Sequence, residues 1–282
     1  MARYWYMRFP GGKSRALTLS YDDCVEQDVR LMSIMDRYGL KGTFNLNGGL
    51  YPHEDKVWPE GQIHRRLKKA EATEVFAESG HEVAVHGYEH QSLADISSVN
   101  ATADVLRDRL ALEEQFGRIV RGMAYANGSY SDSAVQILKD CGIAYARTTV
   151  ATRDFKIPTD WLRLPVTCKH TDPRLMELAE EFITTEKRQP RLFYLWGHSY
   201  EFERDDNWNV IEEFAAYVSN HEDVWYATNI EIYDYVEAYR ALQFSANGDR
   251  VHNPTALSVC FALRESSQTT LITVEPGQTV CF

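Results

Sequence analysis

Short runs of β-branched and aromatic residues alternate along the chain with longer segments in which apolar residues recur at helical spacing. The short runs predict seven strands, at Ala16–Tyr21, Gly42–Asn47, Glu82–His86, Val120–Tyr125, Ile143–Arg147, Leu192–Trp196 and Asp223–Thr228. The segments between them predict helices, at Val25–Tyr38, Leu67–Ser79, Val99–Phe116, Asp132–Asp140, Pro173–Thr184, Val210–Ser219 and Ile230–Leu242.

About seven repeats of strand and helix favour parallel strands joined by helical crossovers, and hence an α/β barrel. A doubly wound open sheet is the structural alternative. In a barrel the functional side chains gather at the carboxyl ends of the strands. The residues that directly follow each predicted strand are therefore the first candidates for a site.

The pattern changes after about Phe244. Residues 256–262 and 269–274 read as strands, Glu275-Pro276-Gly277 as a turn, and residues 279–282 as a further strand. We therefore divide the chain into a barrel over residues 1–243 and a small β appendage over residues 244–282.

The length of the chain bounds its domain size, and its net charge bounds the kinds of molecule it can bind. The chain has 282 residues, enough for one barrel domain, and 30 Lys and Arg against 41 Asp and Glu give a net charge of −11. An acidic chain without a Lys- and Arg-rich run is a poor binder of nucleic acid or an anionic membrane. We expect neither partner and favour a neutral or cationic substrate, while the oligomeric state stays open.

The first ten residues and the cysteine spacing both favour a reducing compartment. Residues 1–10 contain Arg3 and Arg8 and have neither the continuous apolar run nor the cleavage site of a signal peptide. The five cysteines are odd in number and have no paired spacing, which favours free thiols: Cys24, Cys141, Cys168, Cys260 and Cys281. We expect a cytoplasmic protein, although a chain that had lost its leader would look the same.

Residues able to carry chemistry follow several of the predicted strands. Asp22 and Asp23 follow the first strand, His86 and His90 the third, and His198 the sixth. A carboxylate with two histidines four residues apart can hold one divalent metal and leave coordination positions open, as a hydrolytic site requires. A second carboxylate supplies a general base, and a separate histidine supplies an acid.

Each of these residues also has a purely structural interpretation. The two aspartates can cap the following helix, with Glu26 in capping-box register, and taken alone this is the better interpretation. Two histidines four apart form a weak motif, and His198 can satisfy a buried hydrogen bond. The conjunction favours a site, because three separate strands deliver suitable ligands at the same end.

On these residues the sequence resembles the polysaccharide deacetylase family, also called NodB-like or carbohydrate esterase family 4. The family's first motif, Thr-Phe-Asp-Asp-Gly in its usual form, is matched by Leu19-Ser20-Tyr21-Asp22-Asp23-Cys24. Its second motif, His-(Ser/Thr)-x-x-His, is matched by His86-Gly87-Tyr88-Glu89-His90. The resemblance extends over residues 16–239 and implies a distorted (β/α)7 barrel.

Carried over residue by residue, the resemblance implies a role for each matched position. Asp23, His86 and His90 would bind the divalent metal, which is zinc in most of the family, with cobalt, nickel and iron as alternatives for this ligand set. Asp22 would be the general base, and His198, in the family's late Leu-x-His motif, the acid that protonates the leaving group.

The third and fifth motifs imply the remaining site residues and include departures from the family pattern. The oxyanion donor would be the backbone N–H of Asn127. Ala124 replaces the arginine that steadies the catalytic aspartate in many members, and three arginines are open as substitutes: Arg121, Arg147 and Arg163. Trp196 stands where a leucine usually lines the acetyl pocket.

The fourth motif keeps only Asp160-Trp161, with Ile157 in place of its first aspartate. With Tyr125 and Trp196, Trp161 is a candidate for substrate binding. Cys24 replaces the glycine of the first motif, and we interpret it as a packing residue rather than a ligand or nucleophile.

The predicted function is metal-dependent removal of N- or O-linked acetyl groups from a carbohydrate, with an oligosaccharide as the expected substrate. One alternative keeps the site and changes the substrate to a small cyclic amide or ureide, as in allantoinase-like members. The other is a non-catalytic sugar-binding protein on the same fold, which would have no need of an acid–base pair.

Overall fold

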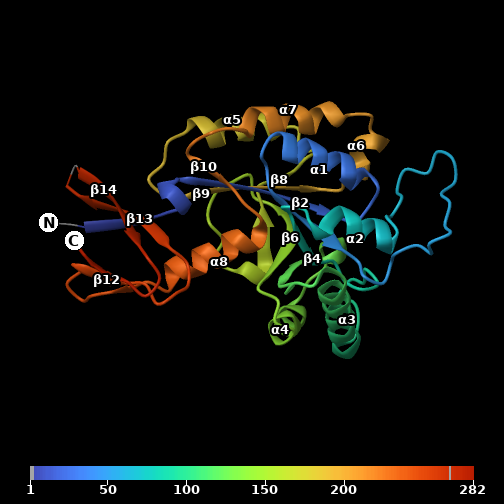
Figure 1. Ribbon diagram of the computed structural model, residues 1–282, viewed down its shortest axis with the longest axis horizontal. Coiled ribbons are helices and arrows are strands. Elements are labelled where there is room, and N and C mark those ends of the chain that lie inside the picture. Colours follow the sequence, from blue (N-terminus) through green and yellow to red (C-terminus); the bar gives the residue numbers. More distant parts are fainter. Residues whose placement is uncertain (1–2, 267) are drawn as a thin grey trace.

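A parallel β-sheet curled into a nearly closed barrel forms the centre of the molecule in the computed structural model, which describes residues 3–266 and 268–282 (Figure 1). Its strands are β2 (Arg15–Asp22), β3 (Gly42–Leu46), β4 (Glu82–Val85), β5 (Gly122–Ala124), β6 (Tyr145–Ala151), β7 (Leu164–Val166), β8 (Cys168–Lys169) and β9 (Arg191–Gly197). They lie in the order β7-β6-β5-β4-β3-β2-β9-β8. The predicted distorted barrel is confirmed, and the doubly wound open sheet is wrong.

One short segment brings the two edges of the sheet together. β7 pairs with β6, and β8 pairs with β9, yet only Thr167 separates β7 from β8. The N–H of Thr167 donates to the carbonyl of Tyr194 at 2.9 Å. The sequence did not predict these two strands, because they are short and contain Pro165. The seventh predicted strand is β10 (Val224–Tyr226), which pairs only with the beginning of β2.

Helices cover the outside of the barrel (Figure 1). They are α1 (Gln27–Arg37), α2 (Lys69–Ala77), α3 (Ser98–Phe116), α4 (Asp132–Asp140), α5 (Leu175–Thr184), α6 (Tyr200–Arg204), α7 (Trp208–Val218) and α8 (Asn229–Arg240), with 3₁₀ turns at Pro10–Gly12, Ala126–Gly128 and Trp161–Arg163. Ser97, Ser131 and Thr228 cap the starts of α3, α4 and α8 with their side chains. All seven predicted helices are confirmed within two residues at each end, whereas the one-turn α6 was missed.

The central barrel strands are buried on both faces. All eight residues of β2 and all seven of β9 are buried, because a parallel strand is covered on both faces. β2 ends at Asp22, and Asp23 follows it directly, so the strand delivers both aspartates of the candidate site.

A second, smaller β structure lies at one end of the molecule, beside both chain termini (Figure 1). One of its sheets joins β1 (Arg3–Arg8), β13 (Val259–Glu265) and β14 (Gln268–Val274), and the other joins β11 (Gln243–Phe244), β12 (Arg250–His252) and β15 (Thr279–Cys281). The three strands predicted after residue 244 correspond to β13, β14 and β15. The division at residue 243 stays a prediction, but β1 pairs with β13 and so lies outside the barrel sheet.

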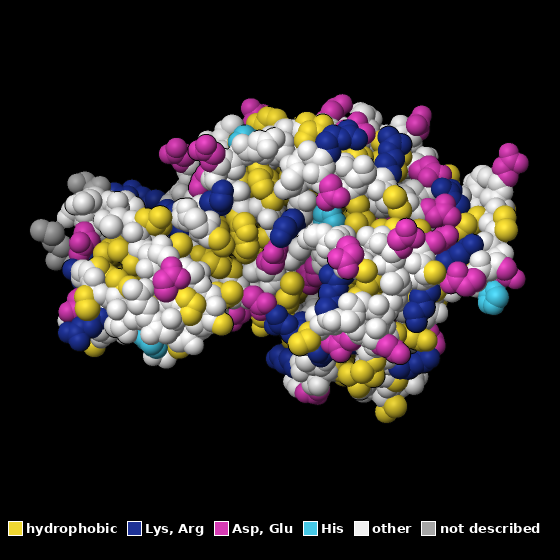
Figure 2. Space-filling view, in the orientation of Figure 1, with side chains coloured by type: hydrophobic (Ala, Val, Ile, Leu, Met, Phe, Trp, Pro, Cys, Tyr) yellow, Lys and Arg dark blue, Asp and Glu magenta, His cyan; other side chains and the backbone are white. Residues whose placement is uncertain are grey.

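None of the helices formed by residues 3–266 and 268–282 combines the length and apolar character needed to cross a bilayer. Basic and acidic side chains are interspersed over the face of the molecule that Figure 2 shows. This mixture agrees with the scattered charges of the sequence.

Candidate active site

A pocket of about 370 Å³ opens at the carboxyl ends of the barrel strands. It is lined by Asp22, Asp23, His86, His90, Tyr125, Asn127, Gly128, Thr149, Trp196, His198 and Tyr200. All the predicted metal-binding, acid–base and oxyanion residues are in this set. The barrel therefore brings together residues that are up to 178 positions apart in the sequence.

Asp22 is the last residue of β2 and lies almost wholly inside the protein. Its Oδ1 accepts from the amide of Asn45 on β3 at 2.8 Å, and its Oδ2 accepts from the guanidinium of Arg147 on β6 at 2.5 Å. Burial raises the pKa of Asp22, but Arg147, followed by His86 and His198, outweighs burial and lowers it below the ordinary value. Asp22 is thus held as a carboxylate.

Arg147 settles which arginine holds this aspartate. Its side chain is 1% exposed and lies over the ring of Trp196, 4.5 Å from the ring centroid. Arg121 instead pairs with Asp234, while Arg163 pairs with surface aspartates of its own. The sequence left the three candidates open, because arginine positions alone do not tell which side chain points into a barrel.

Asp23, His86 and His90 form a cluster that suits a divalent metal. One potential ligand atom from each residue lies within 4.8 Å of the other two. Nδ1 of His86 lies 2.9 Å from the carbonyl of Ala124, so Nδ1 carries the hydrogen and Nε2 is left as the ligand atom. Burial also lowers the pKa of His86, which favours the neutral ring that a metal requires. One carboxylate and two imidazoles therefore fit the predicted ion.

Two residues near this cluster escaped the sequence analysis. Arg66 donates to Oδ1 of Asp23 at 2.9 Å, and Nε2 of His64 lies 3.3 Å from Oδ2. Burial raises the pKa of Asp23, but His64, His86 and Arg66 outweigh burial and lower it. Both residues come from the long connection between β3 and α2, where no sequence motif marks them.

His198 directly follows β9 and lines the same pocket as the metal cluster. Its Nε2 is 3.8 Å from Oδ2 of Asp22, and its Nδ1 is 3.6 Å from Oε1 of Glu201. Burial lowers the pKa of His198, but Glu201 and the two aspartates outweigh burial and raise it. His198 is thus biased toward the protonated form that a general acid needs.

The backbone around the pocket is held in uncommon conformations. Among the described residues eight that are not glycine have positive φ; Asp23, His90 and Asn127 line this pocket, and Cys24 directly follows Asp23. Such strain concentrates where a fold must aim particular groups. Cys24 is buried behind the site and is not part of the three-residue cluster, in line with its interpretation as a packing residue.

The three predicted substrate-binding aromatics separate into two groups. Tyr125 and Trp196 line the pocket, and the hydroxyl of Tyr125 donates to the carbonyl of Leu162 at 2.8 Å. Trp161 does not line it: its indole N–H donates to Glu237 at 2.8 Å, and its ring packs edge-on against Tyr233. The structure therefore leaves Trp161 outside the pocket, because the 3₁₀ turn at 161–163 directs it toward α8.

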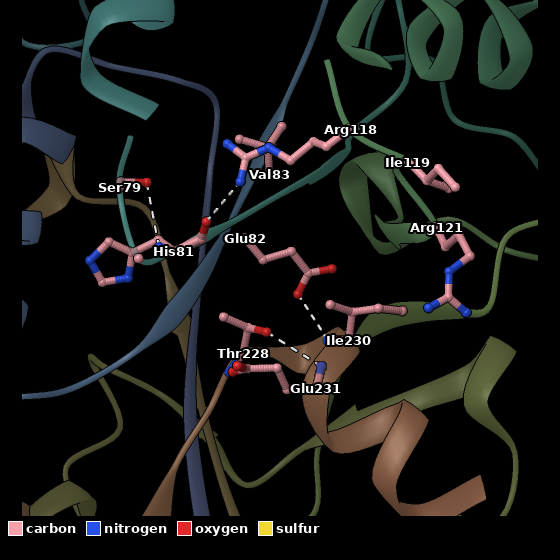
Figure 3. A pocket seen from close by; sticks show the side chains of 11 residues that line it. Ser79, His81, Glu82, Val83, Arg118, Ile119, Arg121, Thr228, Ile230 and Glu231 are labelled. Carbon is pink, nitrogen blue, oxygen red and sulfur yellow. Dashed lines mark hydrogen bonds between the residues drawn. The ribbon is translucent and has the colours of Figure 1, made fainter. Parts of the chain in front are cut away.

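A second pocket, of about 260 Å³, lies at the opposite, amino end of the strands (Figure 3). Glu82 is its buried acid, and three donors occupy the carboxylate: the hydroxyls of Thr43 and Tyr145 and the N–H of Ile230. Glu82 thus fastens the start of α8 to the barrel. Its oxygens are already engaged, so this pocket is not the candidate active site.

Comparison with known proteins agrees with this geometry. The model of the polysaccharide deacetylase family matches residues 7–146, the stretch that carries the first two motifs. Over this stretch, just under half of its length, the chain matches the polysaccharide deacetylase family. No curated protein is significantly similar in sequence to this chain.

Solved structures share the fold at low sequence identity. A Mycobacterium smegmatis protein assigned to the polysaccharide deacetylases has a TM-score of 0.61 at 20% identity, over 83% of this chain and 94% of that one. Puue allantoinase has a TM-score of 0.57 at 14% identity, over 80% and 91% of the two chains. The Xyl-CE4 domain of a multidomain xylanase, from the hindgut metagenome of Trinervitermes trinervoides, has a TM-score of 0.51 at 15% identity, over 83% and 98%.

Proposed function

We propose that this protein is a metal-dependent hydrolase that removes acetyl groups from a carbohydrate. The observation that carries the proposal is the position of one atom, Oδ2 of Asp22. It lies 3.8 Å from Nε2 of His86, a residue of the metal cluster, and 3.8 Å from Nε2 of His198. A base between a metal site and an acid is the arrangement that hydrolysis of an acyl bond requires.

A divalent cation held by Asp23, His86 and His90 would polarise the acetyl carbonyl and make a nearby water more acidic. Asp22 accepts the proton of the attacking water, since its carboxylate faces the space between His86 and His198. The backbone N–H of Asn127 is the proposed donor to the oxyanion.

His198 completes the reaction. As the bond between the acyl carbon and the departing nitrogen or oxygen breaks, Nε2 of His198 gives its proton to that atom. Acetate and a free amine or hydroxyl result. The proton that Asp22 took up then returns to solvent, and His198 takes another.

Metal identity, sugar and location belong to the same proposal. We propose zinc as the metal, because the ligand set of one carboxylate and two imidazoles suits it, although cobalt, nickel and iron fit as well. The pocket of about 370 Å³ is large enough for an acetylated sugar residue, with Tyr125 and Trp196 beside it. The expected substrate is an acetylated oligosaccharide, and the expected location is the cytoplasm.

The test is acetate release from a panel of acetylated oligosaccharides by the wild-type protein and by Asp22→Asn. We expect release by the wild type and a loss of about 10²–10⁴-fold in kcat in the variant, because the general base is removed. Asp234→Asn is the matched control, since Asp234 pairs with Arg121 away from the pocket. Release by neither protein, with hydrolysis of cyclic amides or ureides instead, would replace the acetylated substrate by the allantoinase-like one.

A further inference from the structure

A buried cluster of charged side chains lies directly behind His198. Glu201 is its centre, 5% exposed, and it makes its contacts with both carboxylate oxygens. Oε1 is 2.7 Å from Nζ of Lys169 and 3.6 Å from Nδ1 of His198, whereas Oε2 is 3.1 Å from Nε2 of His170. The proposed mechanism has so far given these groups no role.

The fold places the cluster by two short elements. β8 pairs with β9, with Lys169 opposite Trp196, and the N–H of His170 donates to the carbonyl of Trp196 at 2.9 Å. After His198 the chain turns into α6, and the N–H of Glu201 donates back to the carbonyl of His198 at 3.1 Å. This turn points the glutamate three residues after the histidine back at its ring.

The ring of His170 is tightly packed, and its packing requires a glycine at position 197. The ring of His170 is 2% exposed and packs against Phe202, with centroids 4.2 Å apart, and is stacked on Tyr21. A Cβ atom at Gly197 would lie 2.0 Å from Nδ1 of His170, so only glycine at that position leaves room for the ring. Gly197 is thus required by the packing of His170 in the cluster and not by the shape of the pocket.

Burying a carboxylate is costly unless partners compensate for the lost water. Burial raises the pKa of Glu201, but His170, His198 and Lys169 outweigh burial and lower it, so the side chain is an anion. An anion at this place acts on one reacting group, the imidazole of His198. Ile157, which stands at the position of the first aspartate of the fourth motif, packs against an apolar cluster that includes Trp161 and Ile232 and supplies no carboxylate here.

We propose that Glu201 is a positioning residue for His198, held in place by Lys169 and His170. This inference rests on the proposed function of His198 as the acid. Glu201 faces Nδ1, so Nε2 is turned toward Asp22 and the pocket, and the negative charge stabilises the imidazolium. The distance of 3.6 Å is longer than a hydrogen bond, and we expect it to shorten when substrate is bound.

The charged and titratable groups that contact His198 or its partners define the background of any test. They are Asp22 and Asp23 from the end of β2, Arg147 from β6, Lys169 and His170 from β8 and the residue after it, and Tyr200, Glu201 and Arg204 from α6. Among them, Glu201 is the carboxylate on the Nδ1 side of the ring.

The experiment compares Glu201→Gln and Glu201→Met, which remove the charge, with Glu201→Asp, which keeps it. Glu203→Gln is the control, because Glu203 lies on the same helix and its ion pair, with Arg65, does not involve His198. For the zinc-loaded proteins, kcat and KM for acetate release are measured against pH. The titration of His198 is followed by NMR in histidine-labelled protein, and His198→Gln assigns its signal.

Removing the charge should lower kcat about tenfold or more and leave KM nearly unchanged. The basic limb of the pH profile and the NMR midpoint of His198 should both move down by about one unit, while Glu201→Asp and Glu203→Gln stay close to wild type. A folded Glu201→Gln or Glu201→Met protein with the wild-type midpoint overturns the proposal. If the wild type releases no acetate, the proposed function fails, and the NMR midpoint alone decides the role of Glu201.

Discussion

Replacing Arg147 by methionine tests how Asp22, the proposed general base, is kept ionised. Both partners are buried, with side chains 1% and 3% exposed, so the pair is screened little by solvent. Removing one partner from a buried ion pair costs about 3–5 kcal/mol of stability, because the other charge is left uncompensated. We expect a loss of this size in the free energy of unfolding, measured with denaturant near neutral pH.

The same substitution should change the pH dependence of turnover. In the wild type the pKa of Asp22 is lowered, since Arg147 and the neighbouring histidines outweigh burial. Without Arg147 the effect of burial is less compensated, and the pKa of Asp22 rises. The carboxylate is then protonated at a pH at which the wild type is ionised. We predict that the acid limb of the kcat/KM profile moves to higher pH and that activity at neutral pH falls about 10²-fold.

Arg121→Met and Arg163→Met are the controls that the chain itself offers. Each removes an arginine that pairs with aspartates at the surface, where solvent screens the pair and its contribution to stability is small. Both variants should therefore keep the wild-type pH profile. If Arg147→Met keeps its acid limb and its stability, or if a control loses them equally, Arg147 does not hold Asp22 as the structure indicates.

Three further predictions concern the metal, the acid and the opposite end of the barrel. His86→Ala should lose the bound metal, measured by elemental analysis after dialysis, whereas Asp22→Asn should keep a stoichiometry near one; metal retained by His86→Ala would contradict the ligand set. His198→Gln should lower kcat about 10²–10⁴-fold while metal content stays unchanged, and a small effect on kcat would remove it as the acid. Burial raises the pKa of Glu82 to about 7, so the folded state keeps this proton longer than the unfolded chain and stability falls as pH rises from about 4.5 to 7. In Glu82→Gln that decline, at most about 3 kcal/mol, should flatten in denaturant titrations, and an unchanged decline would refute the assignment.

Much of the barrel could be predicted from the sequence, because its strands and helices have strong local patterns. The 164–169 segment that closes it could not, since two very short strands around a proline have no periodicity to detect. β1 was missed for a different reason. Its mostly half-buried side chains belong to a strand that pairs with β13, more than 250 residues later, and no local signal indicates so distant a partner.

The candidate site shows the same division between motif and packing. Asp22, His86 and His198 are predictable, because they follow strands and match motifs. The partners that tune them come from elsewhere: Arg147 was one of three open choices, and Glu201 carried no motif, although its spacing of three residues from His198 was a usable signal. Trp161 shows the converse, since a matched motif residue points to Glu237 and not into the pocket.

The most direct test of metal-dependent deacetylation is to restore zinc stepwise to metal-stripped protein and measure acetate release at each step. The rate should rise in proportion to bound zinc and level off near one ion per chain, and His86→Ala should stay inactive throughout. Acetate release that is independent of added metal, or a protein that binds one zinc and releases no acetate from any acetylated sugar, would contradict the proposed function.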